Sequence, residues 1–169
     1  VIDLHTHLLP GVDDGSHTVE QSVEVLERFA SQGVTAVCCT PHLLASEAAD
    51  APCDAVDDLL ADLRDAAPPS VALVRGFEVM LDVPAAVFAD RCLTLAGTRY
   101  ILVEFGRLVP ADASVEALAR IVAQGLVPVL AHPERYQICS PEMGRRWVEA
   151  GAVLQLDATT LLAVSRRAD

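Results

Sequence analysis

The chain contains no lysine: its 12 basic residues are all arginine, and 24 acidic residues outnumber them. The absence of lysine excludes Schiff-base catalysis, a Walker A phosphate loop and a metal bridge made by a carboxylated lysine. The net charge of −12 disfavours nucleic acids and anionic membrane surfaces, because binding to either needs clustered positive charge. We therefore expect neither as a partner.

Asparagine is also absent, so the chain has no N-glycosylation site. The cysteines are odd in number and lack C-x-x-C spacing: Cys38, Cys39, Cys53, Cys92 and Cys139. This pattern predicts buried, reduced thiols in a cytoplasmic protein. The first residues have neither the basic region nor the apolar run of a signal peptide, and no uncharged apolar stretch reaches the ~18 residues of a membrane helix, so we expect no membrane insertion.

Strands and helices are predicted to alternate along residues 1–169, a length that suits a single domain. Amphipathic segments end in glycine and are followed by apolar runs, as at Gln32-Gly33-Val34. The predicted strands lie near residues 1–5, 34–39, 71–78, 99–105, 126–131 and 152–157. The predicted helices contain Val19, Val56, Val115 and Met143, and a last helix covers Thr159–Asp169. Alternation of this kind indicates an α/β fold with a parallel sheet, either doubly wound or closed into a barrel.

Histidine or glutamate stands at the carboxyl end of five consecutive predicted strands: His5 and His7, His42, Glu78, Glu104 and His132. His5 and His7 are two residues apart on one strand, so their imidazoles point the same way. The turn after the first strand adds Asp13 and Asp14. Because the carboxyl ends of parallel strands meet at one edge, where α/β proteins build their sites, we expect these groups to converge.

Taken together, these residues indicate a metal site. A single histidine at a strand end is more often a hydrogen-bonded core residue, but a buried charge such as Glu104 is costly unless it is paired or bound to metal. Imidazole and carboxylate ligands without thiolate suit Mn²⁺, Fe or Zn²⁺, and the candidates exceed what one ion needs. Arg135 follows His132 closely and would either bind phosphate oxygens or form a salt bridge to a surface carboxylate.

Short motifs in order along the chain carry a family resemblance: Asp3-Leu4-His5-Thr6-His7, Pro10-Gly11-Val12-Asp13-Asp14-Gly15, Thr40-Pro41-His42, Gly76-Phe77-Glu78-Val79-Met80, Ile101-Leu102-Val103-Glu104-Phe105, Ala131-His132-Pro133-Glu134-Arg135-Tyr136 and Leu154-Gln155-Leu156. They resemble the polymerase-and-histidinol-phosphatase (PHP) superfamily, most closely the bacterial protein-tyrosine phosphatases of capsule and exopolysaccharide operons. The resemblance implies a distorted (β/α)7 TIM-like barrel, with about six β/α units in this chain, and a centre of up to three ions, usually Mn²⁺.

The same resemblance implies a role for each site residue. A first ion would be held by His5, His7 and Glu78, a second by Glu78, Glu104 and His132, and a third by Asp14 and His42. Arg135 would bind the substrate phosphate, and Asp13 is the alternative to Asp14. The family continues beyond this length and supplies an Asp-x-His pair from a further strand, so we expect the sequence to be incomplete.

The implied activity is metal-dependent hydrolysis of phosphotyrosine, with a metal-bridged hydroxide attacking phosphorus. Glu104, His132 and Arg135 would act at the reacting centre. The substrate would be a phosphotyrosine protein such as a bacterial tyrosine kinase, the activity would regulate capsule or exopolysaccharide synthesis, and a homo-oligomer is compatible with the family. Hydrolysis of another monoester, such as histidinol phosphate, is the nearest alternative.

Three other functions compete with this hypothesis. Cys139 and Arg145 have the C-x₅-R spacing of cysteine phosphatases, although Pro141 and Glu142 suit an anion cradle poorly. A metal-dependent amidohydrolase shares the H-x-H motif but often uses a bridging lysine. A weakly active metal-binding remnant would follow from the missing end.

Overall fold

The computed structural model describes residues 1–160 of the chain. Its strands are β1 (Ile2–Thr6), β2 (Ala36–Cys39), β3 (His42–Leu44), β4 (Ala72–Arg75), β5 (Glu78–Met80), β6 (Tyr100–Glu104), β7 (Val127–Ala131) and β8 (Val153–Gln155). Its α-helices are α1 (Val19–Ser31), α2 (Cys53–Ala66), α3 (Ala111–Ala123) and α4 (Pro141–Glu149). Of the helix predicted over Thr159–Asp169, residues 161–169 lie outside the described part of the chain.

Every strand pair in the two sheets is parallel, which confirms the predicted α/β class. One sheet has the order β1-β2-β4 and the other has the order β3-β5-β6-β7-β8. The strands thus follow one another in space in the order of the sequence, as in barrel folds and unlike doubly wound sheets. Among the described residues β1 and β8 remain edge strands, so the structure does not show a closed barrel.

Two short breaks, which the sequence pattern did not predict, separate β2 from β3 and β4 from β5. The prediction for residues 34–39 missed β3, which begins at His42 after the break at residues 40–41. The predicted strand at 71–78 is divided into β4 and β5 by Gly76 and Phe77. Pro41 lies in the first break, where its missing N–H prevents regular pairing. The register is kept across the two breaks, since Cys39 pairs with Arg75 before them and His42 pairs with Glu78 after them.

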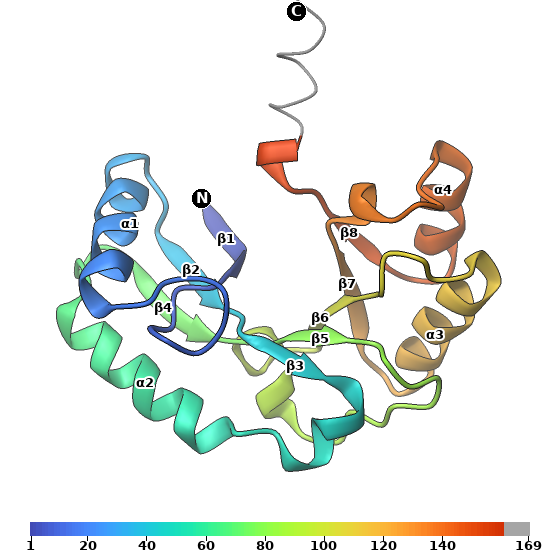
Figure 1. The fold of residues 1–169 in the computed structure, drawn as a ribbon, viewed down its shortest axis with the longest axis horizontal. Helices are drawn as coiled ribbons and strands as arrows, with labels where there is room; N and C mark the ends of the chain where they lie inside the picture. The colour runs from blue at the N-terminus through green and yellow to red at the C-terminus, as the bar shows by residue number, and fades with distance from the viewer. Residues whose placement is uncertain (161–169) are drawn as a thin grey trace, which may run out of the picture.

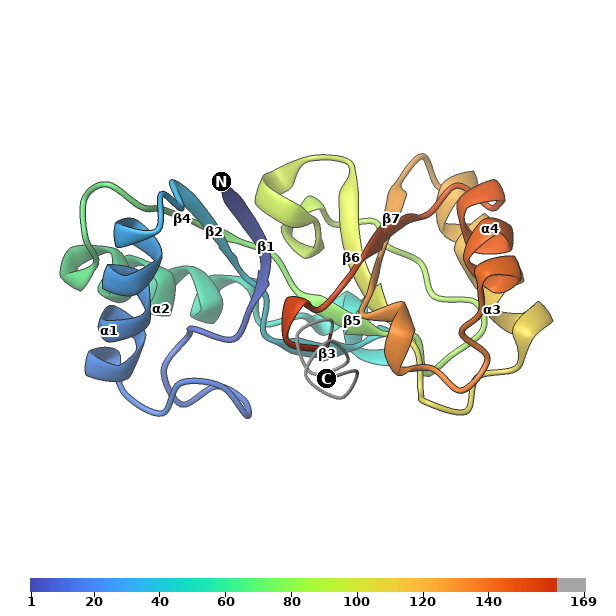
Figure 2. The same cartoon turned by 90° about the horizontal axis from the view of Figure 1, so that it is seen from above.

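The helices pack outside the strands in two pairs, α1 with α2 and α3 with α4 (Figures 1 and 2). The Thr18 side chain caps the start of α1 by accepting a hydrogen bond from the backbone N–H of Gln21. Ser140 caps α4 in the same way. Gly33 follows α1 with a φ of 81°, the left-handed conformation that glycine adopts without strain.

The connection between β5 and β6 lacks the α-helix that strict alternation of strands and helices would place there. It contains two short 3₁₀ helices, Arg91–Leu93 and Leu95–Gly97, and no α-helix. Leu95 is buried among side chains from β2, β6 and β7 and so fills part of the interior that these strands surround. The remaining apolar side chains form one larger core between the strands and the outer helices.

The prediction of five buried, reduced thiols is wrong for three of the cysteines. Cys53, at the start of α2, forms a disulfide with Cys92, and Cys139 is exposed. Only Cys38 and Cys39 on β2 are buried thiols. The spacing of 39 residues between the paired cysteines carries no local sequence signal. No helix within residues 1–160 is long and apolar enough to cross a membrane.

Candidate metal centre

The predicted site residues converge at the carboxyl edges of the strands. They are His5, His7, Asp14, His42, Glu78, Glu104, His132 and Arg135, and all line one cavity of about 680 Å³. The positions of two of them differ from the sequence prediction, because His42 and Glu78 begin β3 and β5 and do not end longer strands. The breaks before β3 and β5 thus put both side chains at the site.

Glu78 is the centre of the cluster, and the residue is only 1% exposed. Its Oε1 lies 2.8 Å from Nε2 of His132. Its Oε2 lies 3.1 Å from Nε2 of His5, 3.2 Å from Nε2 of His7 and 3.2 Å from Nδ1 of His42. Burial alone would raise the pKa of this carboxyl, but its hydrogen bonds with His132, His5 and His7 hold the pKa far below its usual value. Glu78 is therefore ionised.

His5 and His7 each contact one acceptor through Nδ1 and face Glu78 with Nε2. His5 Nδ1 lies 3.0 Å from the amide oxygen of Gln155, and His7 Nδ1 lies 2.7 Å from Oδ2 of Asp13. These partners only accept, so each neutral ring carries its proton on Nδ1. The two Nε2 atoms lie 3.1 Å apart and both face Glu78. Such a group of lone pairs needs either added protons or a shared cation.

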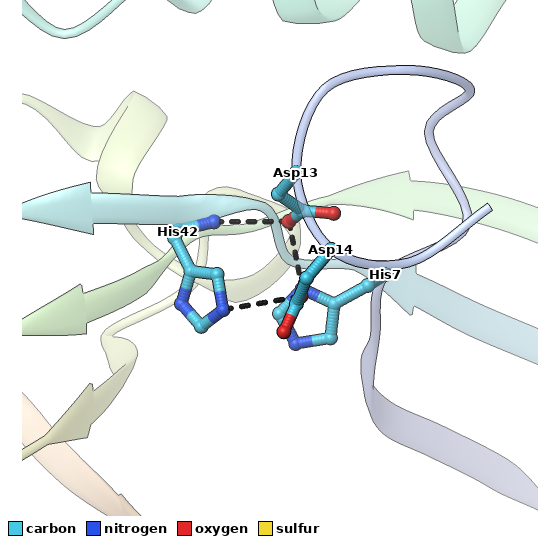
Figure 3. Close-up of side chains that lie close together, drawn as sticks. All are labelled: His7, Asp13, Asp14 and His42. Atoms are coloured by element: carbon cyan, nitrogen blue, oxygen red, sulfur yellow. Dashed lines mark hydrogen bonds and ion pairs between the residues drawn. The ribbon is translucent and has the colours of Figure 1, made fainter. Parts of the chain in front are cut away.

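The loop between β1 and α1 brings two adjacent carboxylates to the cluster, with different contacts (Figure 3). Asp13 is 9% exposed, contacts His7 and accepts a hydrogen bond from the backbone of His42. Asp14 is 80% exposed, and its Oδ1 lies 3.5 Å from Nε2 of His42. Hydrogen bonds to Glu78 and Asp13 outweigh the lowering effect of burial and raise the pKa of His7 to about 9.

Glu104 and His132 complete the other side of the cluster from β6 and the end of β7. Glu104 Oε2 lies 3.8 Å from Nε2 of His132, and its Oε1 lies 3.4 Å from Nδ1 of His42. The buried Tyr136 hydroxyl donates to the carbonyl of Ala131 and accepts from the amide of Phe105. Tyr136 thereby ties together the two strand ends that carry Glu104 and His132.

Arg135 borders the same cavity but is already paired. Its guanidinium bonds to Asp157, as the alternative salt-bridge role predicted, and the Arg135 side chain is 55% exposed. The hydroxyl of Thr159 and the guanidinium of Arg135 hold the pKa of Asp157 well below its usual value. The exposed face of Arg135 leaves guanidinium N–H groups available to an anion in the cavity.

Three overlapping groups of side chains present ligand atoms close enough to share one ion. They are His7, Asp13, Asp14 and His42; His5, Glu78 and His132; and His42, Glu78 and Glu104. Without metal, protonated imidazoles balance the charge of the buried, ionised Glu78, and divalent cations could replace those protons. Imidazole and carboxylate together suit Mn²⁺, Fe or Zn²⁺. The contacts of this donor set are thus compatible with a metal centre.

Cys139 lies outside the cavity, which counts against the cysteine-phosphatase alternative. Partial burial and the nearby Glu134 raise the pKa of its thiol. A nucleophilic cysteine needs the opposite shift, because only the thiolate attacks. Ser140 and Pro141 after it begin α4, so no glycine-rich anion loop follows the thiol.

Comparison with known proteins identifies the family. The sequence model of the capsular polysaccharide synthesis family CpsB/CapC matches residues 1–165. The chain belongs to this family. It is 29% identical to the tyrosine-protein phosphatase YwqE of Bacillus subtilis over 97% of the chain and 67% of YwqE. It is 26% identical to the tyrosine-protein phosphatase CpsB of Streptococcus pneumoniae over 94% of the chain and 68% of that relative.

A solved structure from the same family shows the same fold. It belongs to work on YwqE from Bacillus subtilis and CpsB from Streptococcus pneumoniae, described as metal-dependent tyrosine phosphatases. The TM-score is 0.75 at 26% identity, covering 92% of this chain and 66% of that one. This CpsB/CapC chain thus spans about two thirds of the length of the relatives it matches.

For four contacts at the site, the sequence did not identify which residues are partners. They are the hydrogen bond of Gln155 to His5, the bond of Asp13 to His7, the Tyr136 bridge, and the Asp157 partner of Arg135. Gln155 and Tyr136 belong to motifs of the family, but nothing in their residue types indicates which groups they contact. Asp157 follows the last strand as a carboxylate, which was the only available signal.

Proposed function

We propose that this CpsB/CapC protein is a metal-dependent phosphomonoesterase that acts on phosphotyrosine. The observation that carries the proposal is the ionised, buried Glu78 in contact with four imidazoles inside a cavity that Arg135 also borders. Metal dependence and action on phosphotyrosine are what the YwqE and CpsB relatives are described as having. Both features agree with a site that combines cation ligands with an anion-binding arginine.

The ligand assignment that we propose places up to three ions, Mn²⁺ first and Fe or Zn²⁺ as alternatives. The residues are His5, His7 and Glu78 for the first, Glu78, Glu104 and His132 for the second, and Asp14 with His42 for the third. The contacts favour Asp14 over Asp13. Asp13 already accepts from Gly15, His7 and His42, whereas Asp14 is exposed beside His42. Asp13 would orient His7, since metal-binding histidines usually donate their outer N–H to such a partner.

The side chains of this chain would divide the chemistry of hydrolysis among them. Bound ions would supply an activated water and positive charge for the phosphoryl oxygens. Arg135 would bind the substrate phosphate in a forked geometry. Glu104 and His132 would hold the reacting centre in place from β6 and β7, and the Tyr136 bridge keeps these two strands in register. A tyrosine leaving group has a pKa of about 10, so a strong general acid is not required.

The wider setting follows from the family. We propose that residues 1–169 form a single domain of the distorted (β/α)7 type and that the protein acts in the cytoplasm on a phosphotyrosine protein such as a bacterial tyrosine kinase. A homo-oligomer is compatible with this proposal. Support comes from the sequential order of the parallel strands and from the capsule-synthesis family. The Cys53–Cys92 disulfide is unusual for a cytoplasmic protein.

The proposal is tested by phosphatase assays on the purified protein. Turnover of p-nitrophenyl phosphate and of a phosphotyrosine peptide is measured before chelation, after EDTA, and after Mn²⁺ is restored. We expect activity to vanish with EDTA and to return with Mn²⁺. Full activity after metal removal, or hydrolysis of amides without hydrolysis of phosphoesters, would refute the proposal. Strong preference for histidinol phosphate would favour the nearest alternative, and an absence of turnover with bound metal would favour the remnant.

A further inference from the structure

Gln155, the last residue of β8, connects two histidines of the cluster. Its amide oxygen accepts from Nδ1 of His5 at 3.0 Å and from the backbone N–H of His132 at 3.4 Å. Its amide nitrogen donates to the carbonyl of Leu156 at 3.0 Å. We propose that Gln155 is a positioning residue that fixes the tautomer and ring orientation of His5 toward the metal centre, an inference that rests on the proposed function.

All three contacts require the same orientation of the Gln155 amide. If the amide were turned over, its NH₂ group would face the N–H of His132, and its oxygen would face the carbonyl of Leu156. Both of those arrangements lack a hydrogen bond and are unfavourable. The oxygen therefore faces His5. Because this oxygen only accepts, the proton of a neutral His5 ring is held on Nδ1.

With the proton of the neutral ring on Nδ1, Nε2 of His5 is the nitrogen that can bind a cation at the cluster. That atom lies 3.1 Å from Oε2 of Glu78 and 3.1 Å from Nε2 of His7. A free neutral imidazole adopts either tautomer. Without a fixed acceptor at Nδ1, some His5 rings would therefore carry their proton on Nε2 and could not bind a cation with that nitrogen. Partners of this kind around a metal-binding histidine change metal affinity or activity by about 10–100-fold when they are removed.

The fold explains why a residue of β8 reaches β1. The β7–β8 pairing ends at Ala131 and Gln155, and the next residue, His132, has a φ of 32°. This left-handed conformation ends the strand ladder, and the N–H of His132 goes to the side chain of Gln155. The same side chain then reaches His5 across the open side between the edge strands β1 and β8.

The test compares Gln155→Leu, Gln155→Glu and the control Gln32→Leu, which changes an exposed glutamine after α1. Gln155→Leu removes the acceptor at similar size, and Gln155→Glu keeps an acceptor for His5. The ¹⁵N NMR signals of His5 report its tautomer in metal-free protein at a pH where the ring is neutral. Calorimetry reports Mn²⁺ affinity, and circular dichroism reports folding.

We expect Gln155→Leu to populate both His5 tautomers and to weaken Mn²⁺ binding about 10–100-fold. Gln155→Glu should retain the Nδ1–H form and lose less than about tenfold in affinity, and Gln32→Leu should match the wild type. Unchanged tautomer and affinity in Gln155→Leu would overturn the inference while the proposed function stands. Wild-type protein that neither binds Mn²⁺ nor hydrolyses phosphotyrosine would overturn the proposed function, and the tautomer comparison in metal-free protein would still decide the role of Gln155.

Discussion

At the scale of single residues, Glu78 shows how burial and charge combine in this protein. A carboxylate with 1% exposure persists because imidazole nitrogens surround both of its oxygens. The arrangement is costly without a compensating positive charge. Either protonated histidines or bound cations supply that positive charge.

Replacement of Glu78 by glutamine tests this role. Glu78→Gln keeps the size of the side chain but removes its charge and one acceptor, so we expect phosphatase activity to fall at least about 100-fold. Mn²⁺ binding measured by calorimetry should weaken in parallel. Glu149→Gln, at the exposed end of α4, is the matched control and should change neither quantity. Near-normal activity of Glu78→Gln with intact folding would contradict the assignment.

Thiol labelling provides a second prediction at the residue scale. Burial raises the pKa of Cys38 to about 11 and that of Cys39 to about 12. Raised values keep both thiols protonated and unreactive as the pH rises from 7 to 9, where exposed Cys139 labels faster as its thiolate fraction grows. Native protein at pH 8 should therefore react at one thiol with Ellman's reagent and at three in denaturant.

The labelling experiment also checks the disulfide and the cysteine-phosphatase alternative. Reduction in denaturant should expose the two thiols of Cys53 and Cys92 in addition to the three free ones. Cys139→Ser should retain full phosphatase activity, since the thiol lies outside the cavity. Loss of activity in Cys139→Ser would revive the alternative.

The residue types of the site were predictable, but their hydrogen-bond partners were not. Buried glutamates and histidines at strand ends are rare enough in apolar runs to indicate metal, and the structure brings all of them into one cavity. The partners depend on side-chain geometry across the sheet. His5 and Gln155 are 150 residues apart, and no local pattern links residues at that distance.

At the scale of elements, the loop between β1 and α1 illustrates a tight steric constraint. A Cβ on Gly15 would lie 2.0 Å from the carbonyl oxygen of His7 and 2.4 Å from its Cβ. No side chain fits there without displacement of the backbone. The glycine thus holds the loop against β1, and Asp13 and Asp14 reach the cluster as a result (Figure 3).

Gly15→Ala should displace this loop and so reduce activity. We expect at least about a tenfold fall in kcat/KM, because small misplacement of a site group costs up to about 100-fold in rate. The comparison is Gly33→Ala, where a Cβ would meet nothing within 4 Å but φ is 81°. That variant should lose about 1–2 kcal/mol of stability in urea unfolding and keep its activity. Equal activity losses in both variants would show that general destabilisation, and not the loop, is responsible.

The helices and most strands were predictable because their signals are local. Amphipathic spacing and caps such as Thr18 and Ser140 act within one turn. The division into β2 with β3 and β4 with β5 was missed: one predicted strand ended at residue 39, before the break at residues 40–41, and the other ran through the break at Gly76 and Phe77. The sequence analysis named no helix at residues 81–99, and the structure has two short 3₁₀ helices and no α-helix there.

At the scale of the whole molecule, bound ions should add to the stability of the fold. The proposed ligands come from β1, β3, β5 and β6, from the end of β7, and from the loop after β1. A ligand present at about 100 times its Kd stabilises the folded state by about 2.7 kcal/mol. For a domain of this size that corresponds to a rise in Tm of about 5–10 °C.

The measurement is a thermal melt after EDTA treatment and dialysis, with and without Mn²⁺. The same concentration of Ca²⁺ is the control, because a site rich in imidazole suits Ca²⁺ poorly and should give little rise. Glu78→Gln should lose most of the Mn²⁺ effect. An identical Tm with and without Mn²⁺ would show that the cluster is held together by hydrogen bonds alone.

The contact between β1 and β8 also determines when the cavity can form during biosynthesis. His5 is made about 150 residues before its acceptor on β8 and before the Asp157 partner of Arg135. A nascent chain can pair β1 with β2 long before either partner has left the ribosome. The cavity therefore assembles only after β8 and Asp157 have been made, and a nascent chain that lacks them holds His5 without its Gln155 acceptor.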